Sequence, residues 1–168
     1  MLDNFKEKLK EIKAFVFDVD GVFSQNLFLQ TNGELLRTMN VKDGFALYHA
    51  VNKQGFLAAI ITGGFSESVK IRFREIGLTD IYIKSVNKLD DFEDFISKYN
   101  LTPNQVLYMG DDIPDLEVMK VVGLPTCPVD AAEEIKSISV YISDRKGGEG
   151  CVRDVIEQVL RAQGKWFS

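Results

Sequence analysis

The strongest constraint on the fold is an alternation of short apolar runs with longer stretches of helical periodicity. Short, mostly apolar runs occupy residues 14–17, 56–61, 81–83 and 105–109. Between them, apolar residues recur every three or four positions, as in residues 66–76. A continuous apolar run is typical of a strand buried on both faces of a parallel sheet. Because strands alternate with helices, we predict a doubly wound, mostly parallel α/β fold of the Rossmann type.

A β-hairpin is predicted directly after the first strand. Residues 27–30 and 34–37 flank Thr31-Asn32-Gly33, and Asn-Gly is a strong hairpin-turn signal. We expect this hairpin to project from the sheet as a small flap. Further predicted elements are an amphipathic start at residues 5–12, helices at 43–53, 89–99, 113–121, 131–135 and 152–160, and short strands near 123–127 and 138–142.

Composition excludes several classes of protein. The net charge of -5 argues against a partner such as nucleic acid or an anionic membrane, which requires a basic face. Cys127 and Cys151 have neither metal-ligand spacing nor a close partner, so zinc and disulfides are not expected. No apolar run is long enough to span a bilayer. We expect one cytoplasmic domain over residues 1–168 that binds neither nucleic acid nor membrane.

Acidic residues follow two of the predicted strands. The first strand ends in Asp18-Val19-Asp20-Gly21, and the fourth ends in Gly110-Asp111-Asp112-Ile113-Pro114-Asp115. In parallel sheets, ligands bind beyond the carboxyl ends of the strands, so these carboxylates are expected to gather there. Clustered carboxylates require protons or a metal ion, and oxygen ligands without His or Cys favour Mg²⁺.

Simpler explanations stand beside the functional ones. Asp112 is equally well explained as the N-cap of the following helix. Lys88, just after the third strand, is more often a solvated surface residue unless an anion lies over the sheet edge. Thr62-Gly63-Gly64 is a weak phosphate-binding signal because glycine after a strand is common. His49 is the only histidine, so it is expected to pack or face solvent, which argues against Ser-His-Asp catalysis.

These motifs stand in the order of the four motifs of the haloacid dehalogenase superfamily, which the chain resembles over essentially its whole length. The resemblance implies that Asp18 is the nucleophile, forming an aspartyl-phosphate, and that Asp20 is the general acid. It implies that Thr62, with Gly63, and Lys88 bind the phosphoryl group. The implied Mg²⁺ ligands are Asp18, Asp20 through its main-chain carbonyl, and Asp111, with Asp115 supporting them.

A narrower resemblance is to the capless phosphatases that act on 3-deoxy-D-manno-octulosonate 8-phosphate, an intermediate of lipopolysaccharide synthesis. The chain has no room for a cap domain between its motifs. The features that carry this resemblance are the hairpin, Asn40–Gly44, Gly147–Gly150 and Ala162–Lys165. It implies a homotetramer in which a neighbouring subunit completes each active site. It also implies that Arg72 and residues 145–150 hold the sugar acid's carboxylate or close the site. A flexible entry to the last helix explains the 147–150 turn equally well.

Two departures from this group keep a second substrate open. The chain has Ser24-Gln25-Asn26 where the group usually has Thr-Asp-Gly, and Gly64 where an arginine often follows the Thr-Gly pair. Because Gly64 lies where substrates could be distinguished, the phosphate of a nine-carbon sugar acid is the alternative. Rivals of another class are a phosphoacceptor signalling domain, which leaves Asp20 unexplained, and a non-catalytic assembly domain, which leaves the whole acidic set unexplained.

Overall fold

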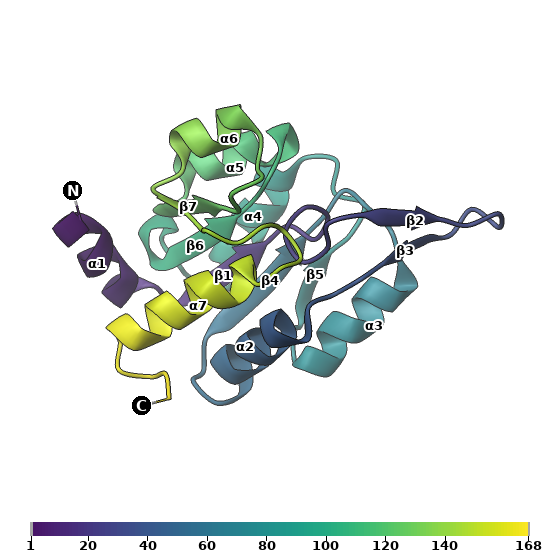
Figure 1. Cartoon of the computed structure of the whole chain (residues 1–168). Coiled ribbons are helices and arrows are strands. Elements are labelled where there is room, and N and C mark those ends of the chain that lie inside the picture. Colours follow the sequence, from purple (N-terminus) through teal and green to yellow (C-terminus); the bar gives the residue numbers. More distant parts are fainter. Residues whose placement is uncertain (1, 168) are drawn as a thin grey trace.

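A six-stranded sheet forms the centre of the structure, a computed structural model that describes residues 2–167. In spatial order the strands are β5 (Asp80–Tyr82), β4 (Leu57–Ile61), β1 (Ala14–Phe17), β6 (Val106–Met109), β7 (Leu124–Cys127) and β8 (Tyr141–Ile142). Each neighbouring pair runs parallel. The chain builds outward from β1 to β5, then returns to the other side of β1 (Figure 1). The predicted doubly wound α/β fold is confirmed.

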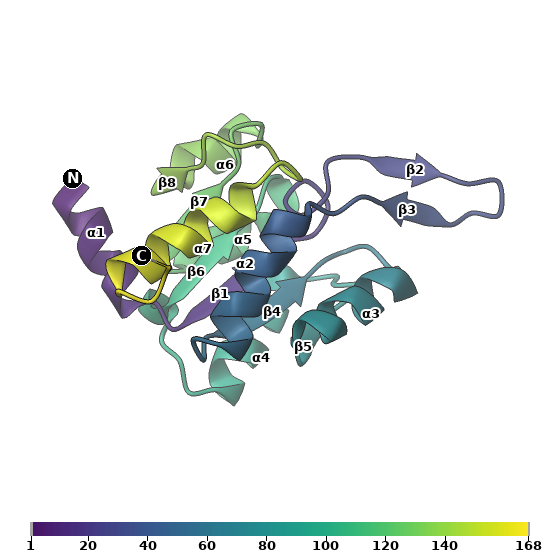
Figure 2. The same cartoon turned by 60° about the horizontal axis from the view of Figure 1, so that its bottom comes forward.

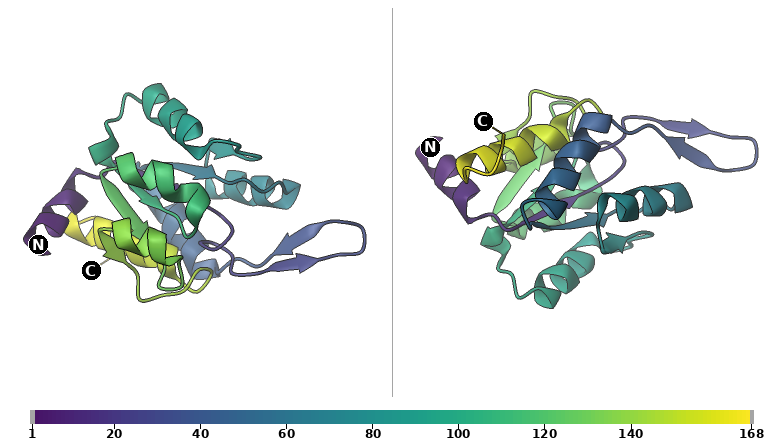
Figure 3. Two further views of the ribbon diagram at one scale, coloured as in Figure 1. Left: turned by 90° about the horizontal axis from the view of Figure 1, so that it is seen from above. Right: turned by 90° about the horizontal axis from the view of Figure 1, so that it is seen from below.

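Helices cover both faces of the sheet because the strand side chains alternate between two apolar cores. Phe15 and Phe17 of β1 point into one core, and Ala14 and Val16 point into the other. The first core is covered by α1 (Leu2–Glu11), α2 (Val41–Asn52), α3 (Glu67–Ile76) and α7 (Cys151–Ala162). Figure 2 shows α2 and α7 side by side in front of the sheet. The second core is covered by α4 (Lys88–Lys98), α5 (Leu116–Val121) and α6 (Glu133–Ile138), seen in the left view of Figure 3.

Two short strands outside the sheet form a hairpin where one was expected. β2 (Leu27–Leu29) pairs antiparallel with β3 (Leu35–Arg37). The hairpin projects from the body of the molecule in every view (Figures 1 to 3). Its apolar side chains are exposed, Leu29 to 80%. No helix among residues 2–167 has the length and apolar character needed to cross a membrane.

Several boundaries differ from the predictions for local reasons. The helix expected at 43–53 begins at Val41, because the Asn40 side chain accepts a hydrogen bond from the Lys42 amide. The helix expected from Ile113 starts as a 3₁₀ turn at Ile113–Asp115, and its α-helical part begins at Leu116. The small helix expected at 131–135 spans Glu133–Ile138.

Candidate active site

The strand register brings the predicted motifs to one edge of the sheet. Phe17 of β1 pairs with Ile60 of β4 on one side and with Met109 of β6 on the other. Asp18, Thr62 and Gly110 therefore leave the sheet at nearly the same level. A cleft of about 750 Å³ lies above this edge. Its lining includes most of the predicted site residues: Asp18, Asp20, Thr62, Gly63, Gly64, Lys88 and Asp111.

Lys88 joins two of the acids. Its Nζ lies 2.7 Å from Asp18 Oδ2 and 2.7 Å from Asp115 Oδ1, and the residue is only 7% exposed. The interpretation of Lys88 as a solvated surface residue is therefore wrong, because carboxylates at the sheet edge hold it inside. Burial lowers the pKa of Lys88, but Asp18 and Asp115 outweigh burial and raise it above its ordinary value.

Asp115 is a fully buried hydrogen-bond acceptor beneath the cleft. Besides Lys88, its Oδ1 accepts a 2.6 Å hydrogen bond from the Tyr108 hydroxyl. Its Oδ2 accepts from the backbone amides of Asp111, at 3.0 Å, and Asp112, at 3.4 Å. Sequence reasoning missed Tyr108, which reads as an ordinary core residue of a buried strand. Asp112 caps the 3₁₀ turn through the Ile113 amide, as the simpler explanation had it.

Asp18, Asp111 and Asp115 form a cluster suited to a metal ion. One carboxylate oxygen from each lies within 4.8 Å of the others. The close approach of Asp111 depends on Gly21, since a Cβ at that position would lie 1.8 Å from Asp111 Oδ2. Gly21 also has a φ of +87°, which side-chain-bearing residues rarely adopt.

The protein groups alone leave this cluster poorly neutralised. Burial, and to a smaller extent the Asp115 carboxylate, raise the pKa of Asp18 to about 7, although Lys88 opposes the shift. Burial, and to a smaller extent the Asp18 and Asp115 carboxylates, raise the pKa of Asp111 to about 8. A divalent cation among these oxygens would stabilise the ionised carboxylates and remove that penalty. An all-oxygen donor set beside an open cleft fits Mg²⁺, which keeps water and phosphate among its ligands.

The segment after β4 carries groups that could bind phosphate, on the opposite side of Asp18 from the β6 acids. The Thr62 side chain is 4% exposed, and its Oγ1 accepts a 3.2 Å hydrogen bond from the Gly64 amide. Gly63 lies exposed between them. The segment is fixed to β5, because the Thr62 amide donates to the Tyr82 carbonyl at 2.9 Å.

Asp20 is held by an arginine that sequence reasoning missed. Arg37 Nε lies 2.6 Å from Asp20 Oδ1, and Arg37 Nη2 lies 3.0 Å from Asp20 Oδ2. Arg37 is the last residue of β3, so the base of the hairpin is tied directly to the second acid of the first motif. No local pattern signals this contact, because the residues are 17 positions apart and Arg37 ends an exposed hairpin strand.

The structure does not bring Arg72 into the cleft. Arg72 lies on α3, half exposed, with its Nη1 3.7 Å from Glu75 Oε2. Together with Arg37 it lines a separate cavity of about 210 Å³ at the base of the hairpin.

The 147–150 turn packs tightly on the first motif. The Gly148 amide donates to the Val22 carbonyl at 2.8 Å, and a Cβ on Gly147 would lie 1.9 Å from the Gly21 carbonyl oxygen.

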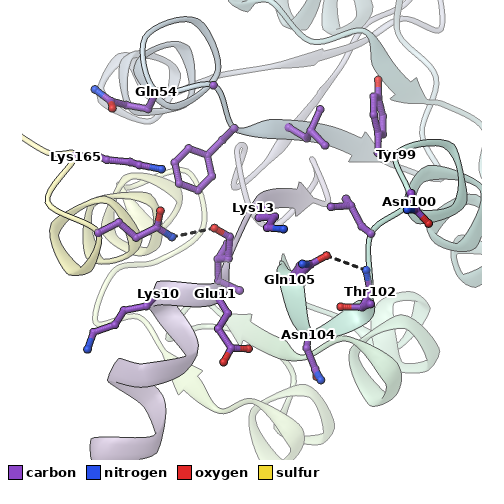
Figure 4. A pocket seen from close by; sticks show the side chains of 16 residues that line it. Lys10, Glu11, Lys13, Gln54, Tyr99, Asn100, Thr102, Asn104, Gln105 and Lys165 are labelled. Atoms are coloured by element: carbon purple, nitrogen blue, oxygen red, sulfur yellow. Dashed lines mark hydrogen bonds between the residues drawn. The ribbon is translucent and has the colours of Figure 1, made fainter.

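A second cleft, of about 770 Å³, lies where β1, β4 and β6 begin, at the opposite edge of the sheet from the acids (Figure 4). Two of its amide side chains bind the backbone. Gln163 Nε2 donates to the Leu9 and Ile12 carbonyls, and Gln105 Oε1 accepts from the Thr102 amide. Its lysines Lys10, Lys13 and Lys165 are exposed. The two glutamines stabilise the loops that connect helices and strands at this edge. The carboxylate cluster lies at the opposite edge.

Comparisons with known proteins identify the family to which the chain belongs. Residues 39–155 match the haloacid dehalogenase-like hydrolase family. The chain is 38% identical to the 3-deoxy-D-manno-octulosonate 8-phosphate phosphatase KdsC of Escherichia coli (strain K12), over 94% of this chain and 84% of that protein. The same phosphatase from Moraxella catarrhalis, solved with magnesium ion, phosphate ion and a KDO molecule, has a TM-score of 0.93 at 32% identity, covering 98% of this chain and 94% of that one.

The enzyme from Yersinia pestis superposes equally well, with a TM-score of 0.94 at 32% identity, over 97% of this chain and 88% of that one. Both the sequence and the structural matches extend across nearly the full length of the chain. The chain therefore belongs to the haloacid dehalogenase-like hydrolases and, within them, to the family of the KdsC phosphatases.

Proposed function

We infer that this chain is a Mg²⁺-dependent phosphatase that hydrolyses 3-deoxy-D-manno-octulosonate 8-phosphate. The observation that carries this conclusion is the buried Asp18–Lys88–Asp115 arrangement beside Asp111, at the floor of an open cleft. The Moraxella relative with the same fold was solved with magnesium, phosphate and KDO, which together represent the cofactor and both products of this reaction.

In the proposed reaction, an Asp18 oxygen attacks phosphorus as the bond from phosphorus to the sugar oxygen breaks. Asp20 gives its proton to that departing oxygen, so an alcohol leaves rather than an alkoxide. Water then gives a proton back to Asp20 and attacks phosphorus, which breaks the aspartyl-phosphate bond, releases phosphate and regenerates Asp18. Dividing hydrolysis in this way replaces one difficult step with two easier ones.

Electrostatic stabilisation comes from groups already fixed in the fold. Lys88 Nζ, 2.7 Å from Asp18 Oδ2, is placed to interact with an oxygen of the transferring phosphoryl group. The Thr62 hydroxyl and the backbone around Gly63 serve the same group from the other side. Asp18 and Asp111, with the Asp20 main-chain carbonyl, would hold Mg²⁺, and Asp115 supports them. When bound, Mg²⁺ neutralises charge on the phosphoryl oxygens and on the carboxylate cluster.

The test is phosphate release from a panel of sugar-acid phosphates, with Mg²⁺ and with EDTA. We expect turnover of the eight-carbon substrate to exceed that of the nine-carbon one, and to disappear in EDTA. Asp18→Asn should abolish turnover and keep the fold, whereas Glu93→Gln, at an exposed acid of α4, should leave activity unchanged. Preference for the nine-carbon substrate would change the substrate assignment. Absence of turnover on every phosphate ester would exclude a phosphatase.

We also propose that residues 1–168 act as one cytoplasmic phosphatase domain that assembles into a homotetramer. The exposed apolar side chains of the hairpin support assembly, since contiguous exposed apolar surface marks interaction sites: Leu27, Phe28, Leu29, Leu35 and Leu36. In that assembly a neighbour would cover the cleft, and Gly64, which lines it, would face the rest of the substrate. Two free, buried cysteines favour a reducing compartment. Light scattering tests the assembly, and a fully active monomer would exclude it.

A further inference from the structure

The Arg37–Asp20 ion pair has the geometry of a positioning device. Both carboxylate oxygens of Asp20 accept from the guanidinium, at 2.6 and 3.0 Å. A two-point contact of this kind fixes the plane of the carboxyl group, which a single contact cannot do. The Arg37 side chain is only 7% exposed, whereas that of Asp20 is 33% exposed at the cleft. Arg37 is fixed in turn, because its Nη1 donates to the Leu35 carbonyl at 3.0 Å.

Gly64 provides the space that the guanidinium occupies. A Cβ at position 64 would lie 2.8 Å from Arg37 Nη2 and 3.2 Å from Asp20 Oδ2. The φ of Gly64 is not positive, so its backbone conformation does not itself require glycine. The requirement is therefore steric, and it comes from the ion pair. An alanine at this position would displace the flexible end of Arg37 without straining the chain.

The positions of the cationic side chains near the cleft also support the pairing of Arg37 with Asp20. Among the described residues that line the cleft, Lys88 is the single cation, and it is already shared between Asp18 and Asp115. Asp20 consequently receives no cationic contact from the floor of the cleft. The cation that contacts Asp20 is Arg37 of the hairpin, which does not line the cleft.

We propose that Arg37 is the positioning residue of the general acid Asp20, and that Gly64 is the residue that gives Arg37 access. The proposal rests on the function given above, in which the proton passes from Asp20 to the departing oxygen. Each carboxyl oxygen has two lone-pair directions. One oxygen can therefore direct its proton into the cleft while the other remains bound to Arg37.

The experiment exploits leaving groups that differ in their need for a proton. Aryl phosphates are assayed with Mg²⁺, from p-nitrophenyl phosphate, whose leaving group needs little protonation, to phenyl phosphate, which needs more. We compare kcat/KM, because it reports the step in which the leaving group departs. With Arg37→Gln we expect a loss of roughly 10- to 100-fold on phenyl phosphate and of less than about twofold on p-nitrophenyl phosphate. The loss caused by Arg37→Lys should lie between those of the unmodified enzyme and Arg37→Gln. Lysine keeps the positive charge but cannot contact both carboxylate oxygens as the planar guanidinium does.

Three further variants complete the test: one that displaces Arg37 without removing it, one control and one reference. Gly64→Ala keeps Arg37 but displaces it, so it should steepen the leaving-group dependence in the same direction. Arg74→Gln removes an exposed arginine from the last turn of α3 and should follow the unmodified enzyme throughout. Asp20→Asn supplies the reference pattern for loss of the general acid.

Each other outcome overturns the proposal in a recognisable way. An equal loss across the series would assign Arg37 a purely structural role. Loss confined to the sugar-acid phosphate, with the aryl series unchanged, would assign Arg37 to the substrate's carboxylate instead of to Asp20. An unmodified enzyme inactive on every phosphate ester would overturn the proposed function itself, before any variant is compared.

Discussion

Removing Mg²⁺ is expected to make the stability of this protein fall as pH rises. Burial raises the pKa of Asp18 to about 7 and that of Asp111 to about 8, from an ordinary value of 3.8. Between about pH 4 and pH 8, the folded state therefore holds protons that the unfolded state has released. Because the unfolded state binds fewer protons in this window, the free energy of unfolding decreases as pH increases.

The size of the effect follows from the Asp18 shift. A pKa of about 7 in place of 3.8 corresponds to roughly 4 kcal/mol less stability above pH 7 than below pH 4. Asp111 does not add its full share, because it is partly exposed and titrates together with Asp18. For a domain of this size, about 4 kcal/mol corresponds to a change of roughly 10 °C in Tm.

Calorimetric melting in EDTA and in saturating Mg²⁺ measures this effect across the same window. The increase in Tm caused by Mg²⁺ should grow with pH, because Mg²⁺ binds the ionised carboxylates and competes with protons. Burial also raises the pKa of Asp43, to about 6, but Asp43 lies outside the site and cancels in the difference between the two conditions. Asp111→Asn should flatten the EDTA curve. A Mg²⁺ increment that stays constant from about pH 5 to about pH 8 would refute the reasoning.

Three substitutions test other contacts in the site. Lys88→Met should lower kcat/KM by roughly 10²- to 10³-fold, because it removes the cation beside Asp18, the proposed nucleophile. A loss below about tenfold would contradict that role. Tyr108→Phe should lower the free energy of unfolding by about 1 to 3 kcal/mol, because Asp115 loses a buried hydrogen-bond donor. Denaturant melts measure this change, and unchanged stability would show that the hydrogen bond contributes nothing. Gly21→Ala should weaken the Mg²⁺-dependent rise in Tm, because its Cβ would meet Asp111, and a full rise would contradict the close packing.

The order of strands and helices was predictable because local signals and tertiary structure agree along most of the chain. The helix Glu67–Ile76 begins after Ser66 and ends at Gly77, whose φ of 110° is the left-handed conformation that its glycine predicts. The start of the helix after β6 was not predictable to the residue. There the Asp112 and Asp115 side chains satisfy the turn's backbone amides and produce a 3₁₀ turn first.

The acids of the site were predictable and their partners were not, for one physical reason. Strand ends converge in a parallel sheet, so Asp18 and Asp111 can be placed together from element order alone. The partners of these acids depend on side-chain paths across the fold. Lys88 resembles a surface lysine until the carboxylates beside it are known, and Tyr108 resembles any core aromatic residue. Arg37 reaches Asp20 from a hairpin whose orientation no sequence pattern specifies.

Asp115 explains how the fold maintains an acidic cluster without using all of its members in the same way. Its oxygens already accept from Lys88, Tyr108 and two backbone amides, so little capacity remains for a metal ion or a substrate. The Asp18 and Asp111 carboxylates make fewer internal hydrogen bonds and carry the raised pKa values. The buried Asp115 therefore fixes Lys88 and the loop, while Asp18 and Asp111 keep oxygens free for the reaction and the metal ion that we propose. This division makes the loss of stability without Mg²⁺ a consequence of the same arrangement that the proposed chemistry requires.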